Sequence, residues 1–278
     1  MKVWLNGVLD DVENLRISPL DHGLLTGDGV FETLRVYGGT PFAWSRHYAR
    51  LMDSASGLDL DVPPDEELRD ATKAVIEANE ILEARLRITI TGGEAPLGSE
   101  RSDARHTVIV AASQVDVPPS TTDVVTAPWA RNEKGATSGM KTISYGENVR
   151  ALAYAHQRGA GEAIFANTRG EVCEATGSNL FLVTDGILHT PPPDSGCLLG
   201  VTRALIIELA ATHGIELRQE ALPLDALKAS NEAFLSSTTR EVQAISAVDG
   251  RDLPMAPGPI TELLRESFSA LVARDLNP

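Results

Sequence analysis

Apolar residues along the chain recur with two spacings, one typical of strands and one typical of helices. Every second residue is apolar in 86–91, which predicts a strand with Leu86 and Ile88 on one face and Arg87 on the other. Helices are predicted over 46–58, 66–80, 148–158, 202–213 and 259–274. Further strands are predicted over 3–6, 8–12, 30–37, 107–112, 163–166, 180–183, 187–190, 232–236 and 242–248. Because strands and helices mix without strict alternation, the pattern predicts an α+β protein rather than a doubly wound parallel sheet.

Linker and turn signals divide this pattern. The stretch Ser113–Thr122 is polar and contains prolines, which is typical of a linker. We therefore predict a small N-terminal domain over 1–115, an interdomain linker over 116–122 and a larger domain over 123–278. A chain of 278 residues is long for one compact core and natural for two modest domains. Within the larger domain, Asp185-Gly186 predicts a hairpin turn, and Thr202 and Gly214 are placed to cap and end a helix.

The composition excludes several classes of protein. With 42% hydrophobic and 23% charged residues, the sequence is ordinary for a globular protein. The 24 basic and 39 acidic residues give a net charge of −15, which argues against a surface for nucleic acid or anionic membrane. No apolar run reaches the roughly 18–20 residues of a membrane span. Cys173 and Cys197 form neither a disulfide framework nor a metal-ligand spacing, so we expect a cytoplasmic protein without a metal.

A glutamate in a turn of small residues gives the first indication of chemistry. Glu174 precedes Ala175-Thr176-Gly177-Ser178 and an apolar strand, and Lys141 lies upstream between glycine-containing stretches. Pyridoxal phosphate (PLP) enzymes use such a pair. The lysine forms an imine with the cofactor aldehyde, and the carboxylate keeps the pyridine nitrogen protonated. Taken singly, each residue is more typical of a solvated surface position, so the pair needs support from elsewhere in the chain.

Other segments are suited to binding a phosphate group. Gly200 leads directly into a helix that begins near Val201 and Thr202, and backbone N–H groups at a helix N-terminus bind phosphate. The hydroxyl cluster 236–239 follows a strand and offers further donors. Arg50, on a predicted helix, could give a forked contact to the same group. Each of these features is commoner as a plain helix cap or a solvated side chain.

Together these segments resemble the signature of class IV aminotransferases, the fold-type IV PLP enzymes. The matching residues are Glu174, Asn179-Leu180-Phe181, Leu188-x-Thr190 and Leu198-x-Gly200-Val201-x-Arg203. The similarity extends to Gly27–Glu32, the Arg50-Leu51 helix, Lys141 and Ser237-Thr238. The resemblance implies PLP as the cofactor. It also implies a two-domain fold, with a small α/β N-terminal domain and a larger pseudo-barrel C-terminal domain.

The resemblance implies a role for each residue that matches the family's cofactor site. Lys141 corresponds to the lysine that bonds to PLP and moves a proton between Cα and C4′. Glu174 corresponds to the partner of the pyridine nitrogen, and Asn179 is expected to hold the turn that aims it. Glu32 resembles a glutamate that many members place near the lysine. The phosphate group is assigned to Arg50, Val201, Thr202 and Thr238.

The substrate pocket departs from the best-known D-amino-acid pattern of the family. Phe31 stands where that pattern has a tyrosine, and Thr91 and Gly93 stand where it has an arginine and a histidine. Some other cation must then bind the substrate carboxylate. Arg87 is our candidate, because it shares a strand face with Thr91 and matches an arginine that branched-chain members use for the acidic co-substrate.

Four further residues are candidates for contact with the substrate. Arg131 and His22 are alternative cations for the carboxylate. Tyr145 falls one residue from the position of a ring-flanking tyrosine in branched-chain members. Thr239 follows Thr238, the residue expected to bind the phosphate, and is the last candidate for contact with the substrate.

Several activities share this signature. We expect amino transfer between an amino acid, of D configuration, and a 2-oxo acid, with (R)-amines as further candidate substrates. The alternatives are a 4-amino-4-deoxychorismate lyase, which forms 4-aminobenzoate and pyruvate, and a branched-chain L-amino-acid aminotransferase. Glu32 favours transfer, because a well-known lyase pattern has threonine there. A PLP-binding module without turnover is a third possibility, but it has no need for the complete Lys141, Glu174 and Arg50 set.

The resemblance also implies an assembly. We expect a homodimer whose active site lies between the two domains and is partly roofed by a loop of the neighbouring subunit. The glycine- and proline-containing segment 92–105 is the candidate loop, although its composition equally suits an exposed turn.

Overall fold

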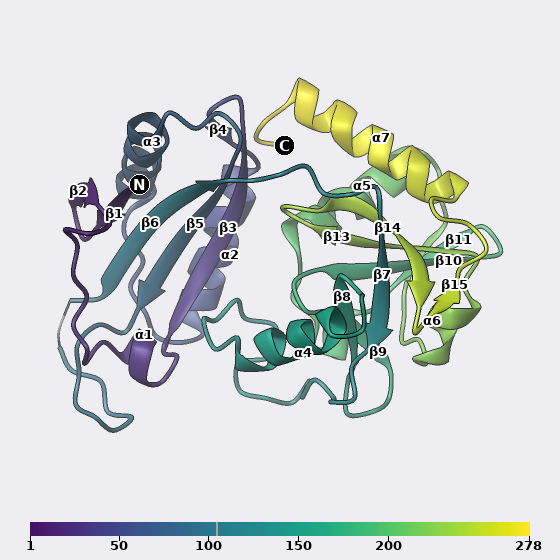
Figure 1. Cartoon of the computed structure of the whole chain (residues 1–278), viewed down its shortest axis with the longest axis horizontal. Coiled ribbons are helices and arrows are strands. Elements are labelled where there is room, and N and C mark those ends of the chain that lie inside the picture. Colours follow the sequence, from purple (N-terminus) through teal and green to yellow (C-terminus); the bar gives the residue numbers. More distant parts are fainter. Residues whose placement is uncertain (104) are drawn as a thin grey trace. The chain divides into compact units, whose positions relative to one another are not determined.

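The computed structural model describes residues 1–103 and 105–278, and the chain forms two compact units (Figure 1). The first unit contains Met1–Asp116, Met140–Tyr145 and Leu276–Pro278. The second, larger unit contains Val117–Gly139 and Gly146–Asp275. Each unit combines a sheet with helices, which confirms the predicted α+β class. Among the described residues, no helix is both long enough and apolar enough to cross a lipid bilayer.

A six-stranded antiparallel sheet of order β2-β1-β6-β5-β3-β4 forms the centre of the first unit. Its strands are β1 (Lys2–Leu5), β2 (Val8–Asp11), β3 (Gly29–Tyr37), β4 (Thr40–Pro41), β5 (Ala84–Thr91) and β6 (Thr107–Gln114). The helices of this unit are α1 (His22–Leu25), α2 (Trp44–Ser56) and α3 (Asp65–Asn79).

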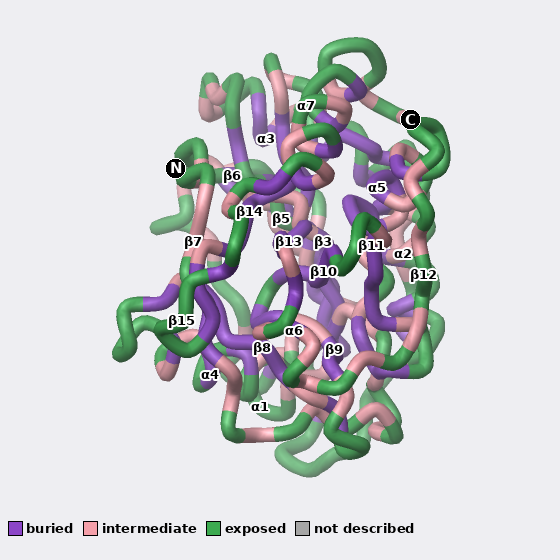
Figure 2. The backbone as a smooth tube through the Cα atoms, turned by 90° about the vertical axis from the view of Figure 1, so that its right-hand side faces the viewer, coloured by how far each residue is buried: buried purple, intermediate pink, exposed green. Residues whose placement is uncertain are grey.

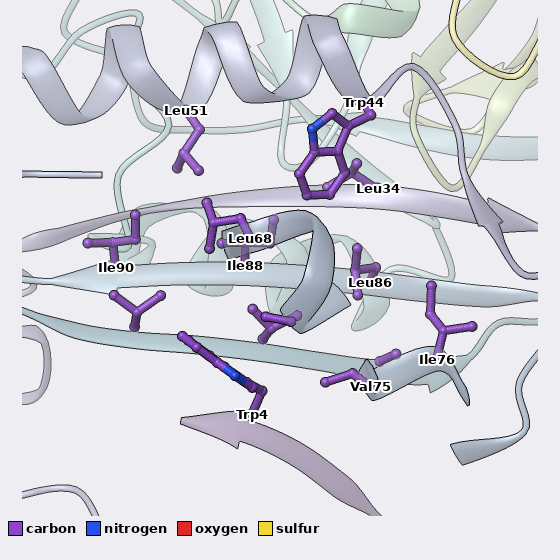
Figure 3. Packing of buried hydrophobic residues seen from close by; sticks show 14 of the residues in the cluster. Trp4, Leu34, Trp44, Leu51, Leu68, Val75, Ile76, Leu86, Ile88 and Ile90 are labelled. Atoms are coloured by element: carbon purple, nitrogen blue, oxygen red, sulfur yellow. The ribbon is translucent and has the colours of Figure 1, made fainter. Parts of the chain in front are cut away.

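The two long helices pack on the same face of this sheet and enclose the core of the unit (Figure 3). Leu34 of β3, Leu51 of α2 and Leu68 of α3 are each at most 1% exposed. Side chains alternate along a strand, so Phe31 of β3 and Arg87 of β5 lie on the other face. The alternation predicted for 86–91 is thereby confirmed. It puts Leu86 and Ile88 on the packed face of the sheet and Arg87 on the other.

The second unit is built on a nine-stranded mixed sheet. Its strands are β7 (Thr121–Thr126), β8 (Glu162–Ala166), β9 (Val172–Ala175), β10 (Asn179–Thr184), β11 (Ile187–Thr190), β12 (Leu217–Gln219), β13 (Glu232–Ser237), β14 (Glu241–Val248) and β15 (Arg251–Asp252). Its helices are α4 (Gly146–His156), α5 (Val201–Thr212), α6 (Asp225–Ala229) and α7 (Pro259–Arg274), with a 3₁₀ turn η1 (Pro193–Ser195).

The sheet of the second unit curls on itself. Its strand order is β12-β11-β10-β13-β14-β7-β8-β9, with β15 beside β14, and β9 at one end also contacts β10. This closure corresponds to the expected pseudo-barrel. The central strands β10 and β13 are almost entirely buried (Figure 2). The ring of Phe181 in β10 stacks on the ring of Phe234 in β13, with 4.8 Å between the ring centres. The predicted hairpin at Asp185-Gly186 is confirmed, since both residues have positive φ and join β10 to β11.

Two local predictions were wrong or incomplete. Thr202 was expected to cap the helix α5, but Gly200 is the N-cap and Thr202 lies in the first turn. A side chain at position 200 would collide with the Asn179 Oδ1 atom, which explains why a glycine takes the cap position there. The strand β7 was not predicted, because Val124 and Val125 are its only strongly apolar residues.

Truncating Leu68 should test the core of the first unit. We expect Leu68→Ala to lower the free energy of unfolding by about 2–5 kcal/mol, because the surrounding layers cannot fill the cavity. Thermal unfolding followed by circular dichroism measures the effect. The control is Leu82→Ala, whose side chain is 67% exposed and should change stability by less than about 0.5 kcal/mol. Equal effects of the two variants would contradict this packing.

Candidate active site

Backbone hydrogen bonds to β3 fix the position of Lys141. The Phe31 N–H donates to the Lys141 carbonyl at 3.0 Å, and the Ile143 N–H donates to the Gly29 carbonyl at 2.9 Å. A Cβ atom on Gly29 would lie only 2.8 Å from the Ile143 side chain, so glycine permits this close approach. The Lys141 N–H donates to the Ser54 hydroxyl of α2. The segment 140–145 is therefore held against the first unit.

The Lys141 amine lies among aromatic rings. Its Nζ atom is 4.2 Å from the centre of the Phe31 ring and 3.4 Å from the Tyr145 hydroxyl. The Phe31 and Tyr145 rings meet edge to face, 5.0 Å apart. The Arg87 guanidinium lies 3.6 Å from the centre of the same Phe31 ring, and its Nε donates to the Thr89 hydroxyl. Four of the predicted catalytic and substrate residues thus meet in the first unit.

Glu32 lies on the opposite face of β3 and is part of a buried charge cluster. Its carboxylate accepts two hydrogen bonds of 2.7 Å from the Arg50 guanidinium, and His47 Nδ1 lies 2.7 Å from the same group. Burial alone would raise the pKa of the Glu32 carboxyl, but Arg50 and His47 outweigh burial and hold the pKa well below its usual range. Burial, together with the charges of Arg50 and Lys141, lowers the pKa of His47 against the opposing effect of Glu32.

Two other predicted substrate residues of the first unit have structural partners. The Thr91 hydroxyl donates to the buried Asp21 carboxylate, which also accepts from Thr107. His22 is buried, with Nε2 2.8 Å from the Pro96 carbonyl and Nδ1 3.9 Å from the Asp28 carboxylate. The network of Thr91 and Asp21 ties the end of β5 to the segment before α1.

Glu174 is the last residue but one of β9 in the second unit, and the chain around it holds its carboxylate. The Leu198 N–H donates to Glu174 Oε2 at 2.9 Å, and Arg131 Nε lies 3.6 Å from Oε1. The Asn179 side chain donates to the Leu198 carbonyl at 2.7 Å. Asn179 therefore holds Leu198, whose N–H in turn binds the Glu174 carboxylate. The Arg131 guanidinium also lies over the Phe165 ring, which fixes its orientation.

The phosphate candidates of the second unit are at a helix start and a turn. Val201 and Thr202 form the first turn of α5, where no side chain caps the N-terminus within the described residues. Thr238 and Thr239 lie in the turn between β13 and β14. Just before it, the buried Ser236 hydroxyl has no hydrogen-bond partner in the described part of the chain. Unpaired N–H and O–H donors of this kind suit a phosphate group.

The donor groups described above fit PLP by their chemistry. Lys141 supplies the amine, Glu174 the carboxylate, and Arg50 a guanidinium. The first turn of α5 supplies neutral N–H donors for a phosphate. The described residues contain no group of three or more His, Cys, Asp or Glu side chains that could hold a metal ion.

Sequence reasoning missed several partners of these residues. His47 lies three positions before Arg50 on α2, and this spacing puts both side chains on one face of the helix. The spacing was the sequence feature that could have identified His47 as a neighbour of Arg50. The Leu198 amide gave no signal, because a backbone donor is independent of residue type. Cys173 and Cys197 are free and buried, and burial raises the pKa of the Cys173 thiol well above its usual range.

Comparisons with known proteins place the chain among a group of related sequences. Residues 29–248 match the family model described as "Amino-transferase class IV". The chain is 35% identical to a putative branched-chain-amino-acid aminotransferase of Methanocaldococcus jannaschii, over 96% of this chain and 95% of that protein. It is 33% identical to a D-alanine aminotransferase of Listeria monocytogenes, over 99% and 97% of the two chains.

A solved structure agrees with these relatives. The branched-chain amino acid aminotransferase of T.th., complexed with N-(5'-phosphopyridoxyl)-L-glutamate, matches with a TM-score of 0.91 at 30% identity. The match covers 98% of this chain and 94% of that one. The predicted two-domain fold is confirmed by this likeness.

Removing the Glu32 charge should destabilise the protein in a pH-dependent way. We expect Glu32→Gln to cost about 3–5 kcal/mol at neutral pH, because it leaves Arg50 buried without its anion. A carboxyl with a lowered folded-state pKa stabilises the fold above its unfolded pKa of about 4.3, and this contribution is lost as the pH falls through the folded value. The gap between wild type and variant should therefore narrow in acid.

Urea unfolding at neutral pH and below about pH 4 measures this gap. Glu77→Gln is the control, because that carboxylate is 66% exposed and its pair with Lys73 should contribute less than about 1 kcal/mol. A gap of constant size from neutral to acid pH would show that the Glu32 charge is not what stabilises the cluster.

Proposed function

The chain belongs to the class IV aminotransferase family, and from this premise we propose that it is a PLP-dependent transaminase moving an amino group between an amino acid and a 2-oxo acid. Enzymes of this family use PLP. The observation that carries the proposal is that the Phe31 ring contacts both the Lys141 amine and the Arg87 guanidinium, with the Tyr145 hydroxyl beside the amine. An amine and a guanidinium that contact one aromatic ring are suited to a substrate that carries a carboxylate.

The residues of this chain are proposed to divide the work of amino transfer. When bound, PLP supplies an electron sink for the electrons released as the substrate loses its Cα proton. Lys141 is proposed to take that proton from Cα and to return it at C4′. Glu174, held by the Leu198 N–H and by Arg131, is proposed to face the pyridine nitrogen and keep it protonated. We propose that Lys141 and Glu174 act on the same cofactor molecule.

We propose ligands for the phosphate of PLP from the chemistry of the side chains and amides. In the second unit these are the Val201 and Thr202 amides and the hydroxyls of Thr202 and Thr238. In the first unit Arg50 is the proposed ligand, and its bidentate pairing with Glu32 fixes the guanidinium in one orientation. Burial opposes the charge of Arg50, but Glu32 outweighs burial and raises its pKa, so Arg50 stays cationic.

We propose a D-amino acid as the amino donor, with pyruvate or 2-oxoglutarate as the acceptor. The segment Gly27–Glu32 is most similar to the D-amino-acid and lyase groups of the family, and D-alanine aminotransferases are among the chain's relatives. The branched-chain L-amino-acid alternative is favoured by Arg87, which lies beside Phe31 where branched-chain members use an arginine for the acidic co-substrate.

A homodimer is proposed as the functional assembly. Several leucines of the first unit are exposed outside its core. They are Leu20 at 39%, Leu24 at 71%, Leu25 at 42% and Leu97 at 79%. Clustered exposed apolar residues are typical of a surface covered by another subunit. Leu97 belongs to the segment 92–105 that we expect to roof the neighbouring site; its residue 104 lies outside the described part of the chain.

A substrate screen tests the proposed activity. We expect D-alanine or D-glutamate, added alone, to convert the bound cofactor to its pyridoxamine form, which absorption spectroscopy detects. L-Leucine, (R)-phenylethylamine and aminodeoxychorismate complete the screen. Lys141→Ala should reduce all turnover to background, because no other group takes the Cα proton. Release of pyruvate from aminodeoxychorismate, with no spectral change from either D-amino acid, would overturn the transaminase proposal in favour of a lyase.

Arg87→Met tests the carboxylate-binding role separately. We expect KM for 2-oxoglutarate to rise by about 10–100-fold, because a hydrogen bond to a charged group contributes about 1.5–3 kcal/mol. The spectrum of the bound cofactor should not change. The matched control is Arg85→Met, two positions earlier on the same face of β5. If KM keeps its wild-type value in Arg87→Met, another cation binds the carboxylate.

A further inference from the structure

A buried carboxylate in the second unit has no part in the chemistry described so far. Glu162 begins β8 and is 3% exposed. Its carboxylate accepts hydrogen bonds from the hydroxyls of Thr176 and Ser178, the latter at 3.2 Å, and from Arg240 Nε at 3.1 Å. A buried charge is costly unless it is paired and hydrogen-bonded, and each of these contacts offsets that cost.

The Arg240 side chain connects this carboxylate to a second turn. Its backbone N–H donates to the Ser237 hydroxyl, so Arg240 closes the turn between β13 and β14. Its guanidinium reaches Glu162, the Gly161 carbonyl at 3.1 Å and the Gln243 side-chain oxygen. Gln243 in turn donates to the Pro119 carbonyl at 2.8 Å. The planar fork of an arginine can hold such a set of acceptors in one geometry, which a lysine cannot.

The two turns joined in this way carry residues of the proposed site. Residues 176–178 connect Glu174-Ala175 at the end of β9 to Asn179 at the start of β10. The turn after β13 contains Thr238 and Thr239, proposed for the phosphate and the substrate. Within the first turn the Ala175 N–H donates to the Ser178 carbonyl at 2.8 Å, and the Ser237–Glu241 pair of the β13–β14 ladder closes the second. Glu162 binds the first turn through two hydroxyls and the second through Arg240.

We propose that the Glu162–Arg240 ion pair is a positioning pair that locks these two turns in register, so that Glu174 and Thr238 are presented together to the cofactor. The inference rests on the proposed function, because it concerns the same site. Neither residue is itself required to touch cofactor or substrate. Their effect would pass through Thr176 and Ser178 on one side and through the backbone of the Thr238 turn on the other.

The experiment compares Glu162→Gln, Arg240→Met and the double variant with wild type. PLP is titrated into the apoprotein and its dissociation constant read from the cofactor's visible absorbance, and thermal unfolding of the apoprotein is measured in parallel. We expect each single variant to bind PLP about tenfold more weakly, the lower end of what outer-shell partners of metal ligands contribute. In the same variants KM for the amino acid should rise as PLP binding weakens, while kcat should change less.

The double variant separates positioning from stability. Each single variant leaves one buried group without its partner, so both should unfold at lower temperature. Removing both charges should restore much of the thermal stability of the apoprotein, whereas PLP binding should remain weak because the two turns are no longer joined. Arg240→Lys keeps the charge without the fork and should fall between wild type and Arg240→Met.

The control variant is Arg218→Met, whose exposed pair with Glu216 lies outside these turns and should change neither measurement. Wild-type PLP affinity in both single variants would overturn the inference, even if their thermal stability fell. Parallel recovery of stability and affinity in the double variant would do the same, because the pair would then be structural only. A wild-type protein that does not bind PLP would instead overturn the proposed function itself.

Discussion

The site depends on a short piece of backbone that pairs with β3. Lys141 follows the first strand of the second unit in sequence, yet its carbonyl and the Ile143 N–H bond to β3 in the first unit. Two backbone hydrogen bonds and the missing side chain of Gly29 fix where the lysine amine can reach. Phe31 and Arg87 project from the sheet face opposite α2 and α3, and the Phe31 ring contacts both the Lys141 amine and the Arg87 guanidinium.

Buried carboxylates have a second organising role, one in each unit. Glu32 holds Arg50 and His47 against β3, and Glu162 holds Arg240 against β8. In both cases a carboxylate that would be costly alone is paired with an arginine and further donors. The chain thereby fixes the direction of side chains and turns that an apolar core could not orient, since dispersion and burial are not directional.

The two thiols near Glu174 add no charge to its surroundings. Cys173 precedes Glu174, and Cys197 precedes the Leu198 amide that binds it. Burial raises the pKa of both thiols, so neither adds a negative charge next to the carboxylate. Arg131 and the Leu198 N–H are two polar groups that hold the Glu174 carboxylate.

The sequence by itself determined the regular elements and the identity of the chemical groups. The alternation in 86–91 predicted which face of β5 is buried, and helical spacing placed α2 and α3 within a few residues of their observed ends. Strand β7 was missed, because it is partly polar and is stabilised by pairing with β14 and β8 rather than by its own pattern. The signature around Glu174 and Lys141 indicated the family and its cofactor.

Only the tertiary structure decided which side chains bind one another. Glu32 and Arg50 are 18 residues apart, and Glu162 and Arg240 are 78 apart. The direction of each side chain depends on the sheet face and the turn from which it projects. Hydrophobic periodicity specifies a face of a strand or helix, but it contains no information on which distant face will lie opposite. That is determined when the sheets assemble and every buried charge must find its partner.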